Sequence, residues 1–286
     1  MSTVKHQEKN YNASEVIVFR KTKEAFGGLS NMASGFPLEV NGVHILTSEA
    51  IYQACRFPHL PHVQEKIILE RSPMSAKMVS KPFREDSRED WDDVRINIMR
   101  WSLRVKLAQN FVEFGKLLET TQNKPIVEDS HKDNFWGAIR DKNGEEILRG
   151  VNALGRLLME LRQNYNDWRY TAKLFYVEPL KIPNFKLYGE HIGVVDEREK
   201  FIEFLGKQFG ISTKNQVVYN SPIIREVTVL NGNTPYIQPN ENVLSVASEP
   251  ITGINTPKAK GSKTNGTKSP KAKAASLKAA SLFEQK

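Results

Sequence analysis

Five apolar side chains recur at alternating steps of three and four residues in the middle of the chain. They are Trp91, Val94, Ile98, Trp101 and Val105. This spacing places all five on one side of an α-helix and predicts a helix of about four turns with one buried face. We expect the helix to begin near Ser87, with Asp90 three residues later as its partner in a capping box. An apolar face of this length must be covered by other elements, which requires a packed domain.

Shorter patterns on both sides of this segment predict the covering elements. Apolar residues at 111–118 and at 154–161 have helical spacing, and Asn152 is the expected N-cap of the second helix. Residues 16–19 and 125–127 resemble short strands, and Asn41-Gly42 between two β-type runs predicts a two-residue hairpin. Ser72-Pro73 has the pattern of a cap followed by a first-turn proline. The predicted fold class is α+β, mainly helical, with small β elements.

Charge divides the chain unevenly. The formal net charge is +8, yet residues 256–286 hold eight lysines and a single acid, which leaves about +1 for the remainder. Lys, Ala, Ser, Thr, Gly and Pro dominate this stretch, and such a composition predicts disorder because it offers little apolar surface to bury. The predicted folded body is therefore nearly neutral, and the basicity belongs to a tail.

The pattern of elements also changes beyond residue 165. Residues 173–177 and 226–230 resemble strands, 197–209 resembles an amphipathic helix, and 231–256 has the composition of a loop. We expect a domain at 1–165, an extension of unknown role at 166–255 that can form a small α/β subdomain, and a disordered Lys-rich tail at 256–286.

Several classes of protein are excluded by what the sequence lacks. It has no apolar run of about 18 residues, so no membrane-spanning helix is expected, and residues 1–15 are too polar for a signal peptide. The single cysteine, Cys55, rules out an internal disulfide framework and fits a small core side chain. His59 and His62 lack a third ligand, so we expect no metal site and no cofactor. A cytoplasmic protein is the expectation.

Residues 47–57 predict a helix that carries polar chemistry on one face. Thr47 or Ser48 can cap its first turn. Glu49, Gln53 and Arg56 follow at i, i+4 and i+7 and so share one face. An acid, an amide and a guanidinium in one row suit a ligand with ribose hydroxyls or phosphate. The spacing is equally that of an exposed polar face with an incidental ion pair.

Four further segments accompany this helix in a fixed order. They are residues 27–32 (GGLSNM), 133–137 (DNFWG), 150–155 (GVNALG) and 157–162 (LLMELR). Together with residues 47–57, they resemble the NADAR (YbiA-like) family, whose pattern runs F-S-N, S-E-x-x-x-Q-A-x-K-F, W-x-x-V-R-x-x-V-M, W-G and G-x-N-x-L-G-x-L-L-M-x-L-R. The resemblance covers about residues 16–165. It implies cleavage of the N-glycosidic bond between a ribose C1 and a nitrogen base.

Such a reaction needs a carboxylate near the sugar, because departure of the base leaves oxocarbenium-like positive charge on the ribose. The resemblance assigns this role to Glu49 and a second acidic role to Asp133, which precedes Trp136. Glu128 and Asp129 are weaker candidates in front of the same loop. Taken singly, each of these acids also fits an exposed, solvated position.

The resemblance also indicates which residues bind the substrate. They are Gly28, Ser30, Asn31, Gln53, Arg56, Trp91, Trp136, Gly137 and Asn152. Trp136 lies in a polar loop and suits stacking on a base, whereas Trp91 is explained equally well by packing in the core. Gly28, Ser30 and Asn31 either present polar groups to the ribose or form an ordinary turn. Asn152 can cap a helix whose N-terminus also accepts phosphate.

One residue departs from the family pattern, because Arg56 stands where lysine is usual. Arginine stays protonated and cannot form an imine with an opened ribose, as proposed for the family lysine in the ADP-ribosyl branch. A covalent route would need another lysine, with Lys81 and Lys106 nearest the motifs. Lys106 lies one residue past the apolar stripe and also fits a solvated position. Direct hydrolysis is therefore favoured over the covalent route.

Three functions remain open at this stage. The first is removal of ADP-ribose from guanine in DNA, an antitoxin or repair activity that implies ADP-ribosylated DNA as substrate and a DNA ADP-ribosyltransferase toxin as cognate partner. The lysine-rich tail favours it, since about seven positive charges add non-specific DNA affinity. The second is an N-glycosidase for ribosylated intermediates of riboflavin synthesis, and the third is a non-catalytic module that binds ADP-ribose or NAD.

Overall fold

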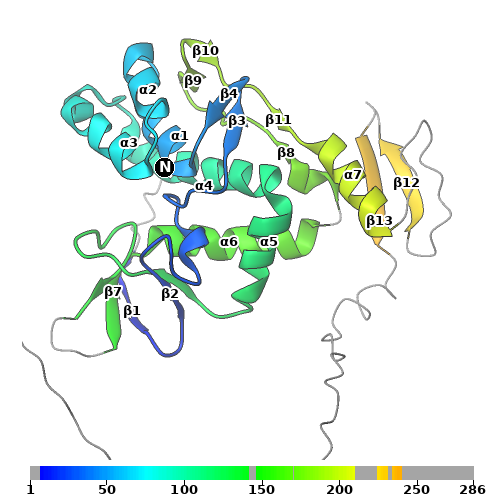
Figure 1. Ribbon diagram of the computed structural model, residues 1–286, viewed down its shortest axis with the longest axis horizontal. Helices are drawn as coiled ribbons and strands as arrows, with labels where there is room; N and C mark the ends of the chain where they lie inside the picture. The colour runs from blue at the N-terminus through cyan, green and yellow to red at the C-terminus, as the bar shows by residue number, and fades with distance from the viewer. Residues whose placement is uncertain (1–6, 142–145, 170, 210–223, 231–233, 240–286) are drawn as a thin grey trace, which may run out of the picture.

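Two long helices, α4 (Trp91–Gln109) and α6 (Ala153–Trp168), cross the middle of the molecule (Figure 1). The computed structural model describes residues 7–141, 146–169, 171–209, 224–230 and 234–239. The predicted basic tail at 256–286 lies outside these residues. None of the described helices is long and apolar enough to cross a membrane.

Helix α4 confirms the apolar stripe read from the sequence. Its five members, Trp91, Val94, Ile98, Trp101 and Val105, are all buried. The predicted start near Ser87 is wrong, because the helix begins at Trp91 and Asp90 occupies the N-cap without a side-chain capping bond. The Asp90 carboxylate instead accepts hydrogen bonds from the buried Arg88 guanidinium, with 2.9 Å between Oδ2 and an Nη atom. An ion pair two residues apart has therefore replaced the capping box.

Three short helices form a layer against one side of α4. They are α1 (Ser48–Ala54), α2 (Pro61–Ile68) and α3 (Pro73–Ser80), followed by the 3₁₀ helix η2 (Lys81–Asp86). Thr47 caps α1 by accepting from the Ala50 N–H, and Ser72 caps α3 by accepting from the Ser75 N–H. Both predicted caps are confirmed.

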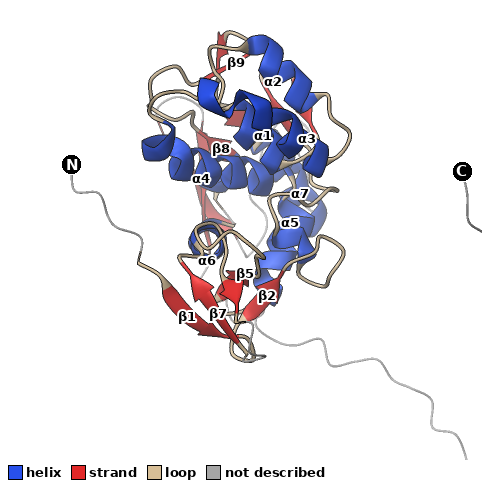
Figure 2. Ribbon diagram, turned by 90° about the vertical axis from the view of Figure 1, so that its left-hand side faces the viewer, coloured by secondary structure: helices blue, strands red, loops and turns tan. Residues whose placement is uncertain are grey.

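Strands and the remaining helices cover the other side. The strands are β1 (Lys9–Asn12), β2 (Ile17–Phe19), β5 (Ile126–Glu128), β6 (Ile139–Arg140) and β7 (Ile147–Gly150). β2 and β5 pair in parallel, and β7 lies between β1 and β6 in an antiparallel sheet. Helix α5 (Phe111–Thr120) and the 3₁₀ helix η1 (Gly27–Leu29) pack nearby. Figure 2 shows α6 between this strand-rich layer and the layer of α1 to α4.

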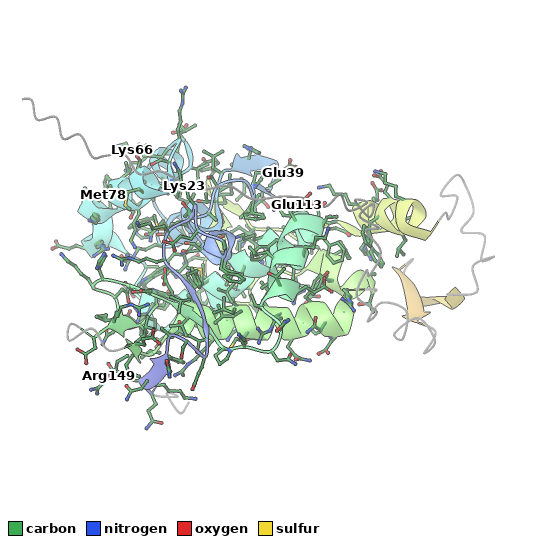
Figure 3. The ribbon with its side chains drawn as sticks, turned by 60° about the horizontal axis from the view of Figure 1, so that its bottom comes forward. Lys23, Glu39, Lys66, Met78, Glu113 and Arg149 are labelled. Atoms are coloured by element: carbon green, nitrogen blue, oxygen red, sulfur yellow. The ribbon has the colours of Figure 1, made fainter. Side chains whose placement is uncertain are left out.

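The predicted hairpin joins β3 (Leu38–Val40) and β4 (Val43–Ile45). Asn41 and Gly42 have φ angles of 51° and 74°. Two consecutive positive φ values are what a primed two-residue turn requires, and Asn-Gly adopts them at little cost. Figure 3 shows Lys66 and Met78 at the end of the molecule formed by α2 and α3, away from Arg149 of β7.

The extension follows α6 and returns along the helical layer. Its elements are the 3₁₀ helix η3 (Ala172–Phe175), the strands β8 (Tyr176–Val177), β9 (Lys186–Leu187), β10 (Glu190–His191) and β11 (Val195–Asp196), helix α7 (Arg198–Phe209), and the paired strands β12 (Ile224–Leu230) and β13 (Thr234–Pro239). The predicted strand at 173–177 is mostly η3, because Leu174 and Phe175 are consecutive and both buried in the core. The predicted loop at 231–256 is wrong at residues 234–239, which form β13. The rest of that range lies outside the described residues.

This extension shares the core of the preceding helices. Phe175 stacks on Phe201 of α7 with 4.5 Å between ring centroids, and both belong to the same apolar cluster as the α4 stripe. The buried Gln64 of α2 donates to the Lys186 carbonyl and accepts from the Tyr188 N–H. Residues 172–205 therefore pack on the residues before them.

Candidate active site

A polar cavity of about 290 Å³ lies where the helical layer meets the strand-rich layer. Its walls come from α1, α3, η2 and α4 on one side and from β5 and residues 130–136 on the other. It brings together Glu49 and Gln53 of α1 with Arg56, which lies two residues beyond that helix, because the helix predicted over residues 47–57 ends at Ala54. Segments far apart in the sequence thus meet around one space.

Glu49 is the most enclosed acid of this cavity, with 2 % of its surface exposed. Asn31 Nδ2 donates to Oε2, and Gln53 Nε2 donates to Oε1 at 2.9 Å. Burial raises the pKa of Glu49, whereas Lys77, the Gln53 hydrogen bond and Arg56 act in the opposite direction. Two amide donors, one on each oxygen, favour the ionised form over the protonated form. The arrangement suits a desolvated carboxylate that faces positive charge.

Glu128 is a second acid on the opposite wall, at the end of β5. Burial raises its pKa to about 7, and the neighbouring Asp133 and Glu49 carboxylates add to the effect. Lys77 acts against this rise. A carboxyl group with this pKa is largely protonated just below neutrality and can donate a proton to a leaving group.

Asp133 lines the same cavity but has a structural task as well. Its Oδ1 accepts hydrogen bonds from the N–H groups of Phe135 and Trp136, at 3.0 and 2.9 Å. This short turn fixes the loop that carries Trp136. The predicted catalytic role of Asp133 stays a prediction, with one carboxylate oxygen already holding the loop.

Aromatic rings from three elements meet at Tyr52 on α1. The Tyr52 ring lies 5.1 Å from Trp91 of α4 and 5.6 Å from Trp136, the latter edge-on at 82°. All three rings line the cavity. Trp91 is also buried in the core, which confirms its packing role, and its contact with substrate stays a prediction. The rings offer apolar faces and edges to a flat base.

Two guanidinium groups also stack on aromatic rings at the cavity. Arg56 lies 4.6 Å above the Trp91 ring centroid, and Arg95 lies 4.0 Å above that of Phe135. Arg84 of η2 lines the cavity beside them. Burial, followed by Arg84 and Arg95, lowers the pKa of Arg56, with Tyr52 and Asp92 opposing. Cations gathered in this way indicate an anionic ligand.

The comparison with known proteins decides the family. A family model described as the NADAR domain matches residues 18–166, which is more than half of the chain. The chain belongs to the NADAR family. This confirms the resemblance and the α+β fold expected from it.

Curated relatives support the same assignment. A riboflavin biosynthesis protein of Vibrio vulnificus is 31% identical over 193 residues, covering 63% of this chain and 50% of that protein. N-glycosidase YbiA of Escherichia coli is 34% identical over 148 residues, covering 52% of this chain and 87% of YbiA. The NMR structure of E. coli YbiA, at 31% identity, covers 54% of this chain and 87% of that one with a TM-score of 0.45. The chain thus matches only half the length of the Vibrio protein.

Four ionisable cavity residues of this NADAR domain go beyond those predicted from the sequence. They are Tyr52, Lys77, Arg84 and Arg95. Tyr52 follows Glu49 at i+3, and Arg95 follows Trp91 at i+4, so helical spacing from a predicted site residue indicates both. Lys77 and Arg84 carry no such signal, because they reach the cavity from α3 and η2 only through tertiary packing.

Three predicted substrate-binding residues, Gly28, Ser30 and Gly137, do not line the cavity. A Cβ on Gly28 would lie 2.6 Å from Leu117 Cδ2, and one on Gly137 would lie 2.6 Å from the Glu128 carbonyl oxygen. These glycines therefore allow close packing of the chain. Ser30 is buried.

Asn152 needs a different correction. It occupies the N-cap of α6 with a left-handed φ of 52°, but its side chain makes no capping bond. It is fully buried and outside the cavity lining, donating to the Ile126 carbonyl at 2.8 Å and accepting from the Glu128 N–H at 3.1 Å. Asn152 thus anchors the strand that carries Glu128. The predicted contact with phosphate or substrate is not supported by this placement.

The two lysines named as alternatives for a covalent step also lie outside the cavity lining, whereas Lys77 belongs to it. Lys81 is exposed. Lys106 is not solvated, contrary to that alternative, but 1 % exposed. Its Nζ donates to the carbonyl oxygens of Gly28 and Ser30, at 2.7 and 3.0 Å. Burial lowers its pKa to about 7.

The remaining candidates for special chemistry have ordinary surroundings. Among the described residues, no group of three or more His, Cys, Asp or Glu side chains is placed to hold a metal ion. His59 is exposed. Cys55 is buried in the core, and burial raises its pKa to about 12, which leaves an inert thiol at neutral pH.

Proposed function

We propose that this chain hydrolyses the N-glycosidic bond between a ribose and a nitrogen base, and that its substrate is ADP-ribose attached to guanine in DNA. The observation that carries the proposal is the Glu49 carboxylate, buried at the cavity wall and held by amide donors from Asn31 and Gln53. A module that only binds ADP-ribose does not need a buried carboxylate at this place, and burying that charge costs free energy.

Glu49 stabilises the positive charge that develops on the ribose as the base departs. A carboxylate removed from bulk water interacts strongly with such charge, because the surrounding dielectric screens it less. Lys77 is the strongest of the groups that oppose the pKa rise of Glu49 and so helps to keep it ionised. Water then attacks the sugar directly.

Glu128 supplies the proton that the leaving base requires. Its pKa of about 7 keeps much of the carboxyl group protonated near neutral pH. Two acids with different surroundings can divide the roles of carboxylate and proton donor. Glu49 has two amide donors on its oxygens, whereas no side-chain donor to Glu128 is found among the described residues.

The aromatic rings of Tyr52, Trp91 and Trp136 hold the base in this proposal. Stacking of a base on an aromatic side chain is worth roughly 1–3 kcal/mol and tolerates different bases. The lysine-rich residues 256–286 support DNA as the carrier of that base, since their net charge of about +7 would add salt-dependent affinity.

A second candidate is an N-glycosidase for ribosylated intermediates of riboflavin synthesis. The names of two relatives favour it, a riboflavin biosynthesis protein of Vibrio vulnificus and N-glycosidase YbiA of Escherichia coli. The same Glu49 and Glu128 chemistry would serve a free ribosylated pyrimidine, with the aromatic rings again holding the base.

One experiment separates these substrates. Release of ribosyl product is measured from a guanine-ADP-ribosylated oligonucleotide and, in parallel, from ribosylated pyrimidine intermediates. The proteins are the wild type, Glu49→Gln and the matched control Glu113→Gln, an exposed acid on α5 that Figure 3 labels. ADP-ribose release that Glu49→Gln abolishes and Glu113→Gln retains is the expected result. Hydrolysis of the pyrimidine intermediates alone would transfer the assignment to the second candidate.

A further inference from the structure

The charged side chains of the cavity are separated into two groups. Asp133 and Lys77 act on the ionisation of both Glu49 and Glu128, and Glu49 also acts on that of Glu128. Arg56, Arg84 and Arg95 form the other group, in which Arg84 and Arg95 act on Arg56. Hereafter these are the acidic end and the arginine end. A ligand that binds at both ends must carry negative charge at one end and a neutral or positive group at the other.

Tyr52 lies between the two ends. Its ionisation responds to Glu49 and Asp133 from the acidic end and to Arg56 and Arg95 from the arginine end. Its ring contacts those of Trp91 and Trp136. A ligand that spans the cavity therefore passes an aromatic wall as it goes from carboxylates to guanidiniums.

The arginine end has unused hydrogen-bonding capacity. The Nε atoms of Arg56 and Arg95 are buried and have no hydrogen-bond partner among the described residues. Arg95 forms an ion pair with Asp92 at 3.4 Å, but that carboxylate side chain is 85 % exposed and well solvated. Stacking on Trp91 and Phe135 orients both guanidinium planes without using their donors. The two stacked guanidiniums lie beside the exposed Arg84, and like charges gathered in this way favour an anionic partner.

We propose that Arg56, Arg84 and Arg95 bind the diphosphate of a ribosyl nucleotide, with the ribose C1 directed to the acidic end. This rests on the proposed N-glycosidase function and names the group that its substrate must carry. A guanidinium binds phosphate oxygens in a bidentate fork, so three of them match the spread of two linked phosphates better than one monoester. The three arginines come from three parts of the chain, with Arg56 in the turn after α1, Arg84 in η2 and Arg95 in α4, which widens the site along the ligand.

The two ends of the cavity bind different parts of the substrate. The arginine end binds a group that does not react, and this binding energy positions the ribose at Glu49. A substrate with a single phosphate would leave part of the arginine end without a partner. The site thereby selects ADP-ribosyl compounds over ribose 5-phosphate compounds.

Equilibrium titration by calorimetry tests the inference without any turnover. The full-length protein is titrated with adenosine, AMP, ADP and ADP-ribose, using the wild type, Arg84→Gln, Arg95→Gln and the control Arg71→Gln. Arg71 is exposed and outside the cavity lining. Circular dichroism verifies that every variant keeps its helical content.

We expect ADP and ADP-ribose to bind at least about tenfold more tightly than AMP, because a second phosphate engages further guanidinium donors. Arg84→Gln and Arg95→Gln should each weaken ADP about tenfold and leave adenosine within about twofold. Equal affinity for AMP and ADP, or arginine variants that match Arg71→Gln, would overturn the diphosphate site.

This result is independent of the glycosidase assay. Diphosphate binding through the arginine end, together with no release from the modified oligonucleotide, would retain the subsite and remove DNA as the substrate. Release from the oligonucleotide with no preference for diphosphate would do the reverse.

Discussion

Asn31 donates a hydrogen bond from Nδ2 to Oε2 of Glu49, although 18 residues separate them in the chain. The two residues are joined a second time through the backbone, where the Asn31 carbonyl accepts from the Glu49 N–H at 2.9 Å and from Ser48 Oγ at 3.0 Å. The turn after η1 thus fixes both the first turn of α1 and the carboxylate that α1 carries.

Glu49→Gln should lower the rate of product release by about 10²–10⁴-fold, because an amide cannot offset positive charge on the ribose. The affinity for ADP-ribose should stay within a few fold, since the arginine end is intact. Single-turnover kinetics on the modified oligonucleotide and calorimetry with ADP-ribose measure the two effects. A variant that retains full activity would remove Glu49 from the mechanism.

The raised pKa of Glu128 predicts that both the reaction rate and the stability of the fold depend on pH. Its pKa in the folded protein is about 7 against an ordinary 4.5, so the wild type should lose activity as pH rises through 7 and the proton donor ionises. Burying the charge costs free energy, so wild-type stability relative to Glu128→Gln should fall between pH 4.5 and 7, by up to about 3 kcal/mol.

Urea denaturation of the two proteins at pH 5 and pH 8 measures the stability change, and a rate profile from pH 5 to 9 measures the activity. Glu128→Gln should be slow throughout and lack the decline near pH 7. A decline that persists in the variant would assign that ionisation to another group.

Lys77 tests direct hydrolysis against the covalent route, because it lines the cavity and influences Glu49. Lys77→Arg keeps the positive charge but cannot form an imine, so direct hydrolysis predicts a rate within about tenfold of wild type. Lys77→Met removes the charge and should raise the pKa of Glu49 further. Borohydride added during turnover should leave Lys77 unmodified by mass spectrometry, and an ADP-ribosyl adduct there would replace hydrolysis by the covalent route.

The two hydrogen bonds of the buried Lys106 amine predict that its removal lowers both the stability of the fold and kcat. Lys106→Met removes a donor from the Gly28 and Ser30 carbonyl oxygens, and because Ser30 keeps the Ala33 N–H, the main cost of about 1–3 kcal/mol comes from the Gly28 carbonyl. The following residue, Asn31, should then hold Glu49 less firmly, so kcat should fall more than KM rises.

The sign of the pH effect distinguishes Lys106 from a general packing defect. Its pKa is lowered from 10.5 to about 7 by burial, so wild-type stability relative to Lys106→Met should rise between pH 7 and 10.5, where only the unfolded chain binds the proton. Denaturation at pH 7 and pH 9.5 provides the comparison. A difference that does not change with pH would show that the lysine titrates normally.

Local chemistry alone determined several parts of this protein. The apolar stripe of α4, the Asn41-Gly42 turn and the caps Thr47 and Ser72 depend on residues within a few positions, so spacing and side-chain type suffice to predict them. The shared face of Glu49 and Gln53 follows from helical geometry in the same way, whereas Arg56 lies beyond the end of α1. The family motifs then indicate which of these faces carries the chemistry.

Only the tertiary structure decided which faces meet and which polar groups are buried. Lys77 reaches Glu49 from a separate helix, and Lys106 is enclosed by the carbonyls of a turn 76 residues away from it. Asn152 turns its side chain to β5 instead of capping α6. Periodicity defines the sides of one element, whereas burial and pKa depend on contacts between elements, and those contacts arise only when the whole core is packed.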